Sequence, residues 1–182
     1  HHNGSCVMTY SAVNCRIYGN TLADCDGGIY FKGAQTEQHG NWAYQNRIID
    51  CATIGIEFGA NTGEGRDRGF LNIISGCVLG IDVGRNGTTD VDLVGNTINA
   101  CTYGISVRLA GPVLRNNIVT NCTTTAIWNR TGGAVSTAID SDYNCFNGNA
   151  DAVGSGDYST EYDTGAQYLA GVQPGDEANS IT

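Results

Sequence analysis

The sequence predicts an all-β fold: a parallel β-helix, or solenoid, of about six to seven coils. Three features that recur together support this prediction. Seven cysteines follow one another at intervals of 19 to 26 residues: Cys6, Cys25, Cys51, Cys77, Cys101, Cys122 and Cys145. An asparagine stands five residues before five of them, and a Gly-Ile pair follows three or four residues after most. A repeat of this length indicates stacked structural units.

Short strands account for the apolar residues of each unit. In residues 28–32, 55–59 and 80–84, apolar side chains occupy every second position, which is the pattern of a strand with one buried face. No segment keeps a 3.6-residue apolar period over three turns, so helices are not expected. Each strand can pair with the matching strand of the next unit, which places one coil about 4.8 Å above the last.

The asparagine and cysteine columns are expected inside the coils. Stacked asparagines can bond their amides to one another and to turn backbone, so that buried polar groups stay paired. The ladder asparagines are Asn20, Asn46, Asn72, Asn96 and Asn117. We interpret the cysteines as buried thiols that pack as small hydrophobes. Disulfides between neighbouring coils are an alternative that needs local distortion, since a disulfide prefers Cβ atoms near 3.8 Å apart. A metal site is disfavoured because no C-x-x-C spacing occurs.

One coil shows the full motif, Asn-x-Ile-x-x-Cys-x-x-Gly-Ile, at residues 96–105. With this motif the chain resembles the right-handed parallel β-helix (pectate-lyase-like) superfamily, over roughly residues 10–147. The resemblance implies a right-handed coil, in keeping with the general bias of parallel crossovers. It leaves function open, because that superfamily includes lyases, hydrolases, epimerases, tailspikes and adhesins. A leucine-rich repeat has a similar period, but leucine is too sparse here for that fold.

Composition narrows the classes of partner. The net charge of −9 argues against a nucleic-acid partner, which requires a basic face. No run of 18 apolar residues exists, so no membrane insertion is expected. Residues 1–149 are predicted to form the coils, and residues 150–182 an irregular acidic segment. Both ends suggest a part of a longer chain or an end-to-end assembly, and we expect a secreted or cell-surface protein.

The strand after each glycine offers the best candidate functional surface. If its isoleucines point inward, the next residues point outward by strand alternation. That outward column reads Tyr30, Glu57, Asp82, Ser106 and Trp128. Two residues further on, a second outward column reads Lys32, Gly59, Gly84, Arg108 and Arg130. One face would therefore stack aromatic, acidic and hydroxyl groups beside three cations.

Glu57 and Asp82 are the predicted catalytic pair, since adjacent coils would hold them about one strand spacing apart. Two carboxyl groups near 5 Å suit a retaining glycosidase. The same pair could bind Ca²⁺ through its oxygens, which is the one cofactor we expect here. A lyase needs a base, and Lys32 or Arg108 could serve. The alternative is a solvated face on which Lys32 and Arg108 simply neutralise the acids.

Further residues are candidates for substrate binding. Tyr30 and Trp128 could stack on sugar rings, with Arg130 beside them. The loops at residues 33–42 and 59–69 lengthen their coils and are expected to wall a groove beyond Glu57. They contribute three further candidates: His39, Arg66 and Arg68. The alternatives are an exposed histidine and a local ion-pair cluster around Asp67.

Together these features predict an extracellular domain that binds a polysaccharide and cleaves or epimerises it, by lyase or glycosidase chemistry. The alternative is a non-catalytic structural or adhesive module, such as a segment of a fibre, tailspike or surface protein. Whether the chain is an enzyme depends on the outward face: an enzyme needs a fixed constellation across two or three coils, whereas a spacer needs only solubility.

Overall fold

Three sheets, parallel except for the last strand of one of them, wrap around one core in the computed structural model, which describes residues 4–32, 39–59, 65–84, 91–108, 112–130, 139–155 and 160–162. Sheet 1 contains β1 (Ser5–Tyr10), β4 (Gly27–Lys32), β7 (Ile54–Phe58), β10 (Leu79–Val83), β13 (Tyr103–Val107), β16 (Thr125–Asn129), β19 (Asp151–Ser155) and β20 (Thr160–Tyr162). Sheet 2 contains β2 (Arg16–Tyr18), β5 (Trp42–Tyr44), β8 (Asp67–Phe70), β11 (Val91–Val94), β14 (Val113–Arg115) and β17 (Asp140–Asp142). Sheet 3 contains β3 (Thr21–Ala23), β6 (Arg47–Ile49), β9 (Ile73–Ser75), β12 (Thr97–Asn99), β15 (Ile118–Thr120) and β18 (Cys145–Asn147).

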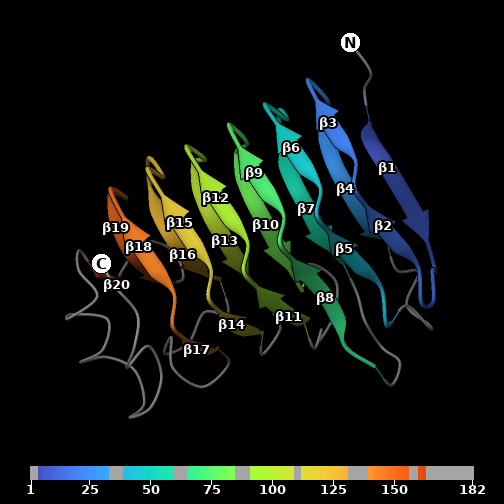
Figure 1. Cartoon of the computed structure of the whole chain (residues 1–182). Coiled ribbons are helices and arrows are strands. Elements are labelled where there is room, and N and C mark those ends of the chain that lie inside the picture. Colours follow the sequence, from blue (N-terminus) through green and yellow to red (C-terminus); the bar gives the residue numbers. More distant parts are fainter. Residues whose placement is uncertain are drawn as a thin grey trace.

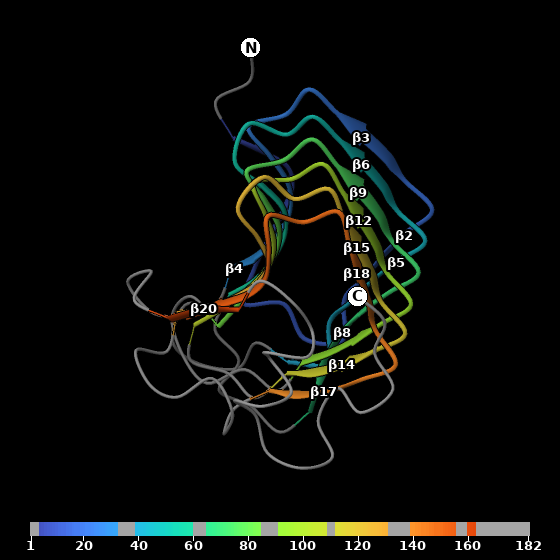
Figure 2. The same cartoon turned by 90° about the vertical axis from the view of Figure 1, so that its left-hand side faces the viewer.

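Each coil contributes one strand to every sheet, so the chain winds through the three sheets in turn and each coil stacks on the one before it (Figure 1). The view along the stack shows the three sheets around a central core (Figure 2). This confirms the predicted all-β parallel solenoid. Sheets 2 and 3 hold six strands each. No helix of the described residues is long and apolar enough to cross a membrane.

The interior is built from side chains that stack in register. In sheet 1, Ile29, Ile56, Ile81, Ile105 and Ile127 pair in succession, and all are buried. The glycine that precedes the first four of these isoleucines has a steric reason, and Ala126 takes its place before Ile127. A Cβ at Gly80 would lie 2.5 Å from the carbonyl oxygen of Gly104 in the next coil, which no side chain tolerates. The Gly-Ile signal therefore marks the place where the chain approaches its neighbour most closely.

The asparagine ladder exists as predicted and extends one coil further. Each Asn Oδ1 accepts bonds from the backbone N–H and the Nδ2 of the asparagine in the preceding coil, as Asn96 does from Asn72 at 3.1 and 2.9 Å. Asn144 adds a sixth member, accepting from Asn117 at 2.9 Å. The cysteine spacing did not identify Asn144 as a ladder residue. Cys145 follows it directly, whereas the other ladder asparagines precede a cysteine by five residues.

Two of the seven cysteines do not belong to the cysteine column. Cys6 occupies the glycine position, since its neighbours Ser5 and Val7 pair with Gly27 and Ile29. Cys145 pairs with Ile118 on sheet 3. Cys6 reaches the next coil and forms a disulfide with Cys25, with a Cα separation of 5.9 Å. The parallel-stack argument against disulfides does not apply to that pair, because its members come from different columns.

Of the five cysteines in the true column, Cys25 is in the disulfide, which corrects the prediction of a free thiol there. The other four are buried free thiols, as predicted: Cys51, Cys77, Cys101 and Cys122. Cys15, directly before β2, is also a free thiol and packs half-buried against the core.

The C-terminal part begins with one more strand of the stack. β19 pairs in parallel with β16, and β20 then turns back antiparallel onto β19. Residues 163–182 lie outside the described residues, so the boundary at residue 149 stays a prediction.

Candidate binding groove on sheet 1

The outward column of sheet 1 has the predicted register. Tyr30 pairs with Glu57, Glu57 with Asp82, Asp82 with Ser106, and Ser106 with Trp128. Met8 of β1 precedes Tyr30 in the same column. The strand pairing therefore brings four predicted site residues, Tyr30, Glu57, Asp82 and Trp128, into one line with Ser106 across five coils.

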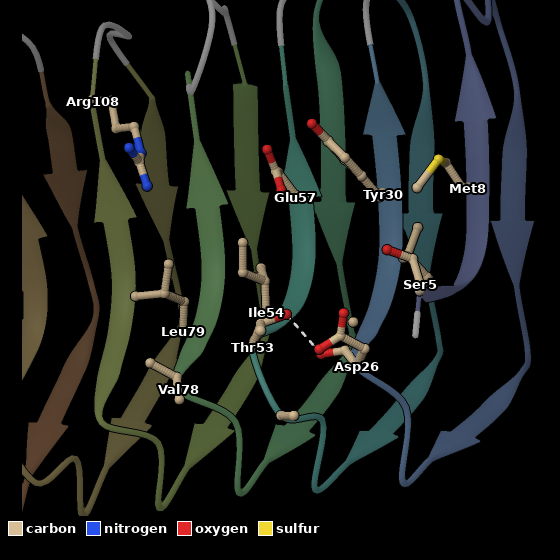
Figure 3. A pocket seen from close by; sticks show the side chains of 14 residues that line it. Ser5, Met8, Asp26, Tyr30, Thr53, Ile54, Glu57, Val78, Leu79 and Arg108 are labelled. Atoms are coloured by element: carbon tan, nitrogen blue, oxygen red, sulfur yellow. Dashed lines mark hydrogen bonds between the residues drawn. The ribbon is translucent and has the colours of Figure 1, made fainter. Parts of the chain in front are cut away.

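A cavity of about 480 Å³ lies over the first part of this column. Its lining includes the apolar Ile54 and Leu79, which are register partners, beside the polar Ser5, Asp26 and Thr53. Tyr30, Glu57 and Arg108 provide polar groups at its side. Figure 3 shows Arg108, Glu57, Tyr30 and Met8 following one another across the strands, above Leu79, Ile54 and Ser5. The lining of the cavity itself ends at Arg108. We call the cavity, together with the outward column as far as Trp128, the sheet 1 groove.

Glu57 and Asp82 are both buried although they point outward, with exposed fractions of 3% and 0%. Arg108 covers Asp82: its Nε lies 3.2 Å from both carboxylate oxygens. The backbone N–H of Arg108 bonds to the carbonyl of Val83 in the preceding coil. The Arg108 side chain therefore reaches back one coil to contact Asp82. Asp82 is therefore held as a charged partner of a guanidinium, whereas Glu57 lines the cavity itself.

The pair makes a poor Ca²⁺ site. Ca²⁺ takes six to eight oxygen ligands, and the described residues contain no cluster of three or more His, Cys, Asp or Glu side chains placed to hold a metal. The guanidinium on Asp82 would also repel a cation.

The far end of the groove is aromatic. Tyr103 stacks on Trp128 with ring centroids 4.2 Å apart, and Arg130 lies 4.0 Å above the Trp128 ring. Ser106, beside them, is fully buried, and its Oγ has no hydrogen-bond partner among the described residues. Sequence reasoning missed Tyr103. The available signal was its position directly before Gly104, which is the position that Leu79 holds before Gly80. The two residues pair in register, and Leu79 lines the cavity.

Lys32 lies at the opposite end of the second column. Its Nζ is 5.0 Å from the centre of the Tyr10 ring and 6.0 Å from that of Tyr30. These are cation–π distances. Lys32 thus contacts the aromatic edge of the groove.

The remaining candidates are not part of this groove. Arg66 and Arg68 lie at sheet 2, where their Nε atoms contact Asp92 at 3.0 and 3.4 Å. The backbone of His39 forms an isolated parallel β-bridge with Val13, and its side chain lies beside Gly65. The buried Nδ1 of His39 has no hydrogen-bond partner among the described residues. These residues follow the loops at 33–38 and 60–64, which lie outside the described residues. The predicted loop walls around Glu57 therefore stay a prediction.

Comparison with known families identifies the β-helix family. A family model described as a right handed beta helix region matches residues 1–143, which is most of the chain. The chain belongs to this right-handed β-helix family. The match agrees with the predicted handedness and with the observed solenoid. No curated protein and no solved structure matches this chain.

Proposed function

We propose that this β-helix domain binds a polysaccharide along the sheet 1 groove. The observation that carries the proposal is the groove itself: a line of aromatic, acidic and cationic side chains from Tyr30 to Trp128, with a cavity of mixed apolar and polar lining over its first part. Sites for small organic ligands are mostly apolar, with a few polar groups that fix orientation. A linear ligand suits this line, because successive coils repeat at a strand spacing of about 4.8 Å.

The two ends of the groove have different expected roles. Trp128 and Tyr103 offer an aromatic surface for the apolar face of a sugar ring. Lys32, Arg108 and Arg130 supply positive charge in a chain whose net charge is −9. Arg108 is paired with Asp82, and Asp26 and Glu57 add carboxylates at the cavity, so the groove carries both signs of charge and the proposal covers neutral as well as acidic glycans.

Cleavage of the bound chain is a second candidate function, favoured by the position of Glu57. Its side chain is buried and lines the cavity, and a carboxyl group shielded from water can act as general acid or base. Asp82 and Arg108 would then orient the site. A non-catalytic structural or adhesive role needs none of these groups at the groove.

Binding is tested by titrating the domain against acidic and neutral polysaccharides with isothermal calorimetry. Trp128→Ala is expected to weaken binding at least tenfold, equivalent to about 1.4 kcal/mol. Tyr143→Asn is the matched control, because Tyr143 is an exposed aromatic on another corner of the coil. Equal losses in both variants, or no binding to any polysaccharide, would sink the proposal.

Cleavage is tested separately with Glu57→Gln and the double variant Glu57→Gln/Asp82→Asn. If Glu57 acts as acid or base, the single variant retains binding but releases no new chain ends. Turnover that continues at the wild-type rate in both variants removes these carboxyl groups from any mechanism.

A further inference from the structure

The outward face of sheet 2 is not used by the sheet 1 groove and carries an ordered pattern of its own. Two outward columns run along its six strands. The first column is Arg16, Trp42, Arg68, Asp92, Val113 and Asp140. The second column is Tyr18, Tyr44, Phe70, Val94, Arg115 and Asp142. All twelve side chains are exposed or half-buried, while the residues between them point inward.

The first three coils make this face aromatic and cationic. Arg16 and Arg68, from the two neighbouring coils, lie 3.7 and 5.2 Å from the centre of the Trp42 ring. In the second column, the rings of Tyr18, Tyr44 and Phe70 stack at 4.8 and 4.7 Å. Tyr18 remains 58% exposed. Monomeric proteins rarely leave such a contiguous patch uncovered.

The last three coils have the opposite character. They carry three carboxylates, Asp92, Asp140 and Asp142, with the smaller apolar residues Val94 and Val113. Arg115 is the one cation in these two columns over the last three coils, and it forms an ion pair with Asp140. The charge of the face therefore changes sign from its first half to its second half.

We propose that a second copy of this chain covers this face, in an antiparallel dimer whose twofold axis runs parallel to the strands. Such an axis places each column opposite the same column of the partner and reverses the order of the coils. Coil one then faces coil six, coil two faces coil five, and coil three faces coil four. An interface of this kind is isologous, so each contact occurs twice.

This arrangement matches residues of complementary chemistry at all six levels. In the first column, Arg16 faces Asp140, Trp42 faces Val113, and Arg68 faces Asp92. In the second column, Tyr18 faces Asp142, Tyr44 faces Arg115, and Phe70 faces Val94. The pairs comprise two ion pairs, one phenol–carboxylate pair, one cation–π pair and two apolar pairs. No two like charges face each other.

The interface is small and charge-dependent. Five strand spacings give it a length of ~24 Å, and it is two outward residues wide on each strand. That size belongs with the interfaces below about 1,200 Å² of total buried surface, which are typical of transient complexes. We therefore expect a monomer–dimer equilibrium that weakens as salt is added. Sheet 1 lies on another side of the coil, so the proposal is independent of the groove (Figure 2).

The test is sedimentation velocity of the wild-type protein over a concentration series at low and high salt, followed by charge reversal. Arg16→Glu places a carboxylate opposite Asp140 of the other copy, and Asp140→Arg places a guanidinium opposite Arg16. Each variant alone is expected to raise the dimer dissociation constant by about tenfold or more. An equimolar mixture of the two is expected to regain dimers, because the heterodimer has opposite charges at both of these contacts.

Controls separate this effect from changes in net charge or folding. Arg47→Glu makes the same charge change on an exposed residue of sheet 3 and should leave the dimer unchanged. Arg16→Ala removes one attraction without adding a repulsion and should weaken the dimer less than Arg16→Glu. A wild-type protein that stays monomeric throughout the series overturns the proposal, as does a mixture that fails to regain dimers. A monomer that loses affinity for an anionic polysaccharide on Arg16→Glu overturns it too, and would make this face a ligand site.

Discussion

Two polar ladders run up the inside of the coils, and only one of them is fully paired. The ladder between sheets 2 and 3 has six asparagines, from Asn20 to Asn144, each bonded to the next. The ladder at the start of sheet 2 has three members: Cys15, Asn41 and Asp67. It ends at Asp67, whose Oδ1 accepts from the Asn41 N–H at 2.7 Å and whose buried Oδ2 has no partner among the described residues.

The difference shows what an asparagine supplies that a carboxylate does not. An amide carries an acceptor and two donors, so it can bond to the coil below and the coil above. Asn96 uses its Nδ2 for the Gly69 carbonyl at 2.8 Å and for Asn117 Oδ1 at 3.0 Å. A carboxylate is acceptor-only and carries a charge that burial penalises. Asparagine can therefore propagate a ladder, whereas aspartate terminates it.

Removing an amide from the middle of the long ladder should have the largest effect. Asn96→Ala removes the buried acceptor of the Asn72 N–H and Nδ2 and the Nδ2 donor to the Gly69 carbonyl, while Asn117 Oδ1 keeps its bond from the Asn96 backbone N–H. Each buried orphan costs roughly 1–3 kcal/mol. We expect the free energy of unfolding, measured by urea denaturation, to fall by about 4 kcal/mol.

Asn20→Ala is the matched control at the open end of the same ladder. Asn20 is exposed and bonds to Tyr18 and Asn46, so water can replace its contacts and a loss of about 1 kcal/mol is expected. If both variants lose the same stability, burial is not what makes the ladder important.

Completing the short ladder should have the next largest effect, with the opposite sign. Burial raises the pKa of Asp67 to about 7 from an ordinary value of 3.8, against the lowering effect of its bond to Asn41. Because the folded pKa exceeds the unfolded one, the charged carboxylate destabilises the fold. The cost is absent below about pH 4, grows between pH 4 and 7, and is complete above pH 7. It amounts to roughly 2–4 kcal/mol.

Asp67→Asn keeps the acceptor for the Asn41 N–H and removes the charge. We expect the variant to be more stable than wild type at pH 8 by roughly 2 kcal/mol or more, and equally stable near pH 4. Urea unfolding at a series of pH values measures this. A wild-type stability that does not decline between pH 4 and 7 would show that Asp67 is not buried as a carboxylate.

The repeat made the solenoid predictable because each column of the sequence has one physical task. Glycine marks the closest approach between coils, isoleucine fills the core, and asparagine forms the hydrogen bonds that the buried polar groups at the turn need. The errors arose where a residue type was read without its column. Cys6 and Cys145 fit the spacing but lie in the glycine column and on sheet 3. Spacing alone does not fix register when coil length varies.

The candidate site was predictable only in part. Strand alternation gave the column from Tyr30 to Trp128, because register in a parallel stack carries directly from one coil to the next. It could not show that Arg108 pairs with Asp82 one coil back, since a long side chain can reach either neighbour. Strand alternation also could not place Arg66 and Arg68, which we had grouped with Glu57. The chain turns a corner between sheets 1 and 2, so these arginines lie at sheet 2 and contact Asp92.

The smallest expected effect concerns the corner that precedes each asparagine of the long ladder. This corner takes a positive φ in every coil, and its residues are Gly19, Gln45, Leu71, Gly95, Asn116 and Tyr143. Leu71 has φ of 54° and is 54% exposed, so it has neither the backbone preference nor the burial to suit the position. A left-handed conformation costs such a residue about 1 kcal/mol, whereas asparagine tolerates it.

Leu71→Asn should therefore stabilise the fold by about 1 kcal/mol, which corresponds to a rise in Tm of about 2–4 °C for a chain of this size. Thermal unfolding followed by circular dichroism measures it. Leu71→Ala is the control, because alanine removes the exposed side chain but keeps the unfavourable backbone. Equal gains in both variants would assign the effect to the lost apolar surface. A gain confined to asparagine would assign it to the corner, and would show that the ladder's turns, like its amides, are set by residues that satisfy the backbone locally.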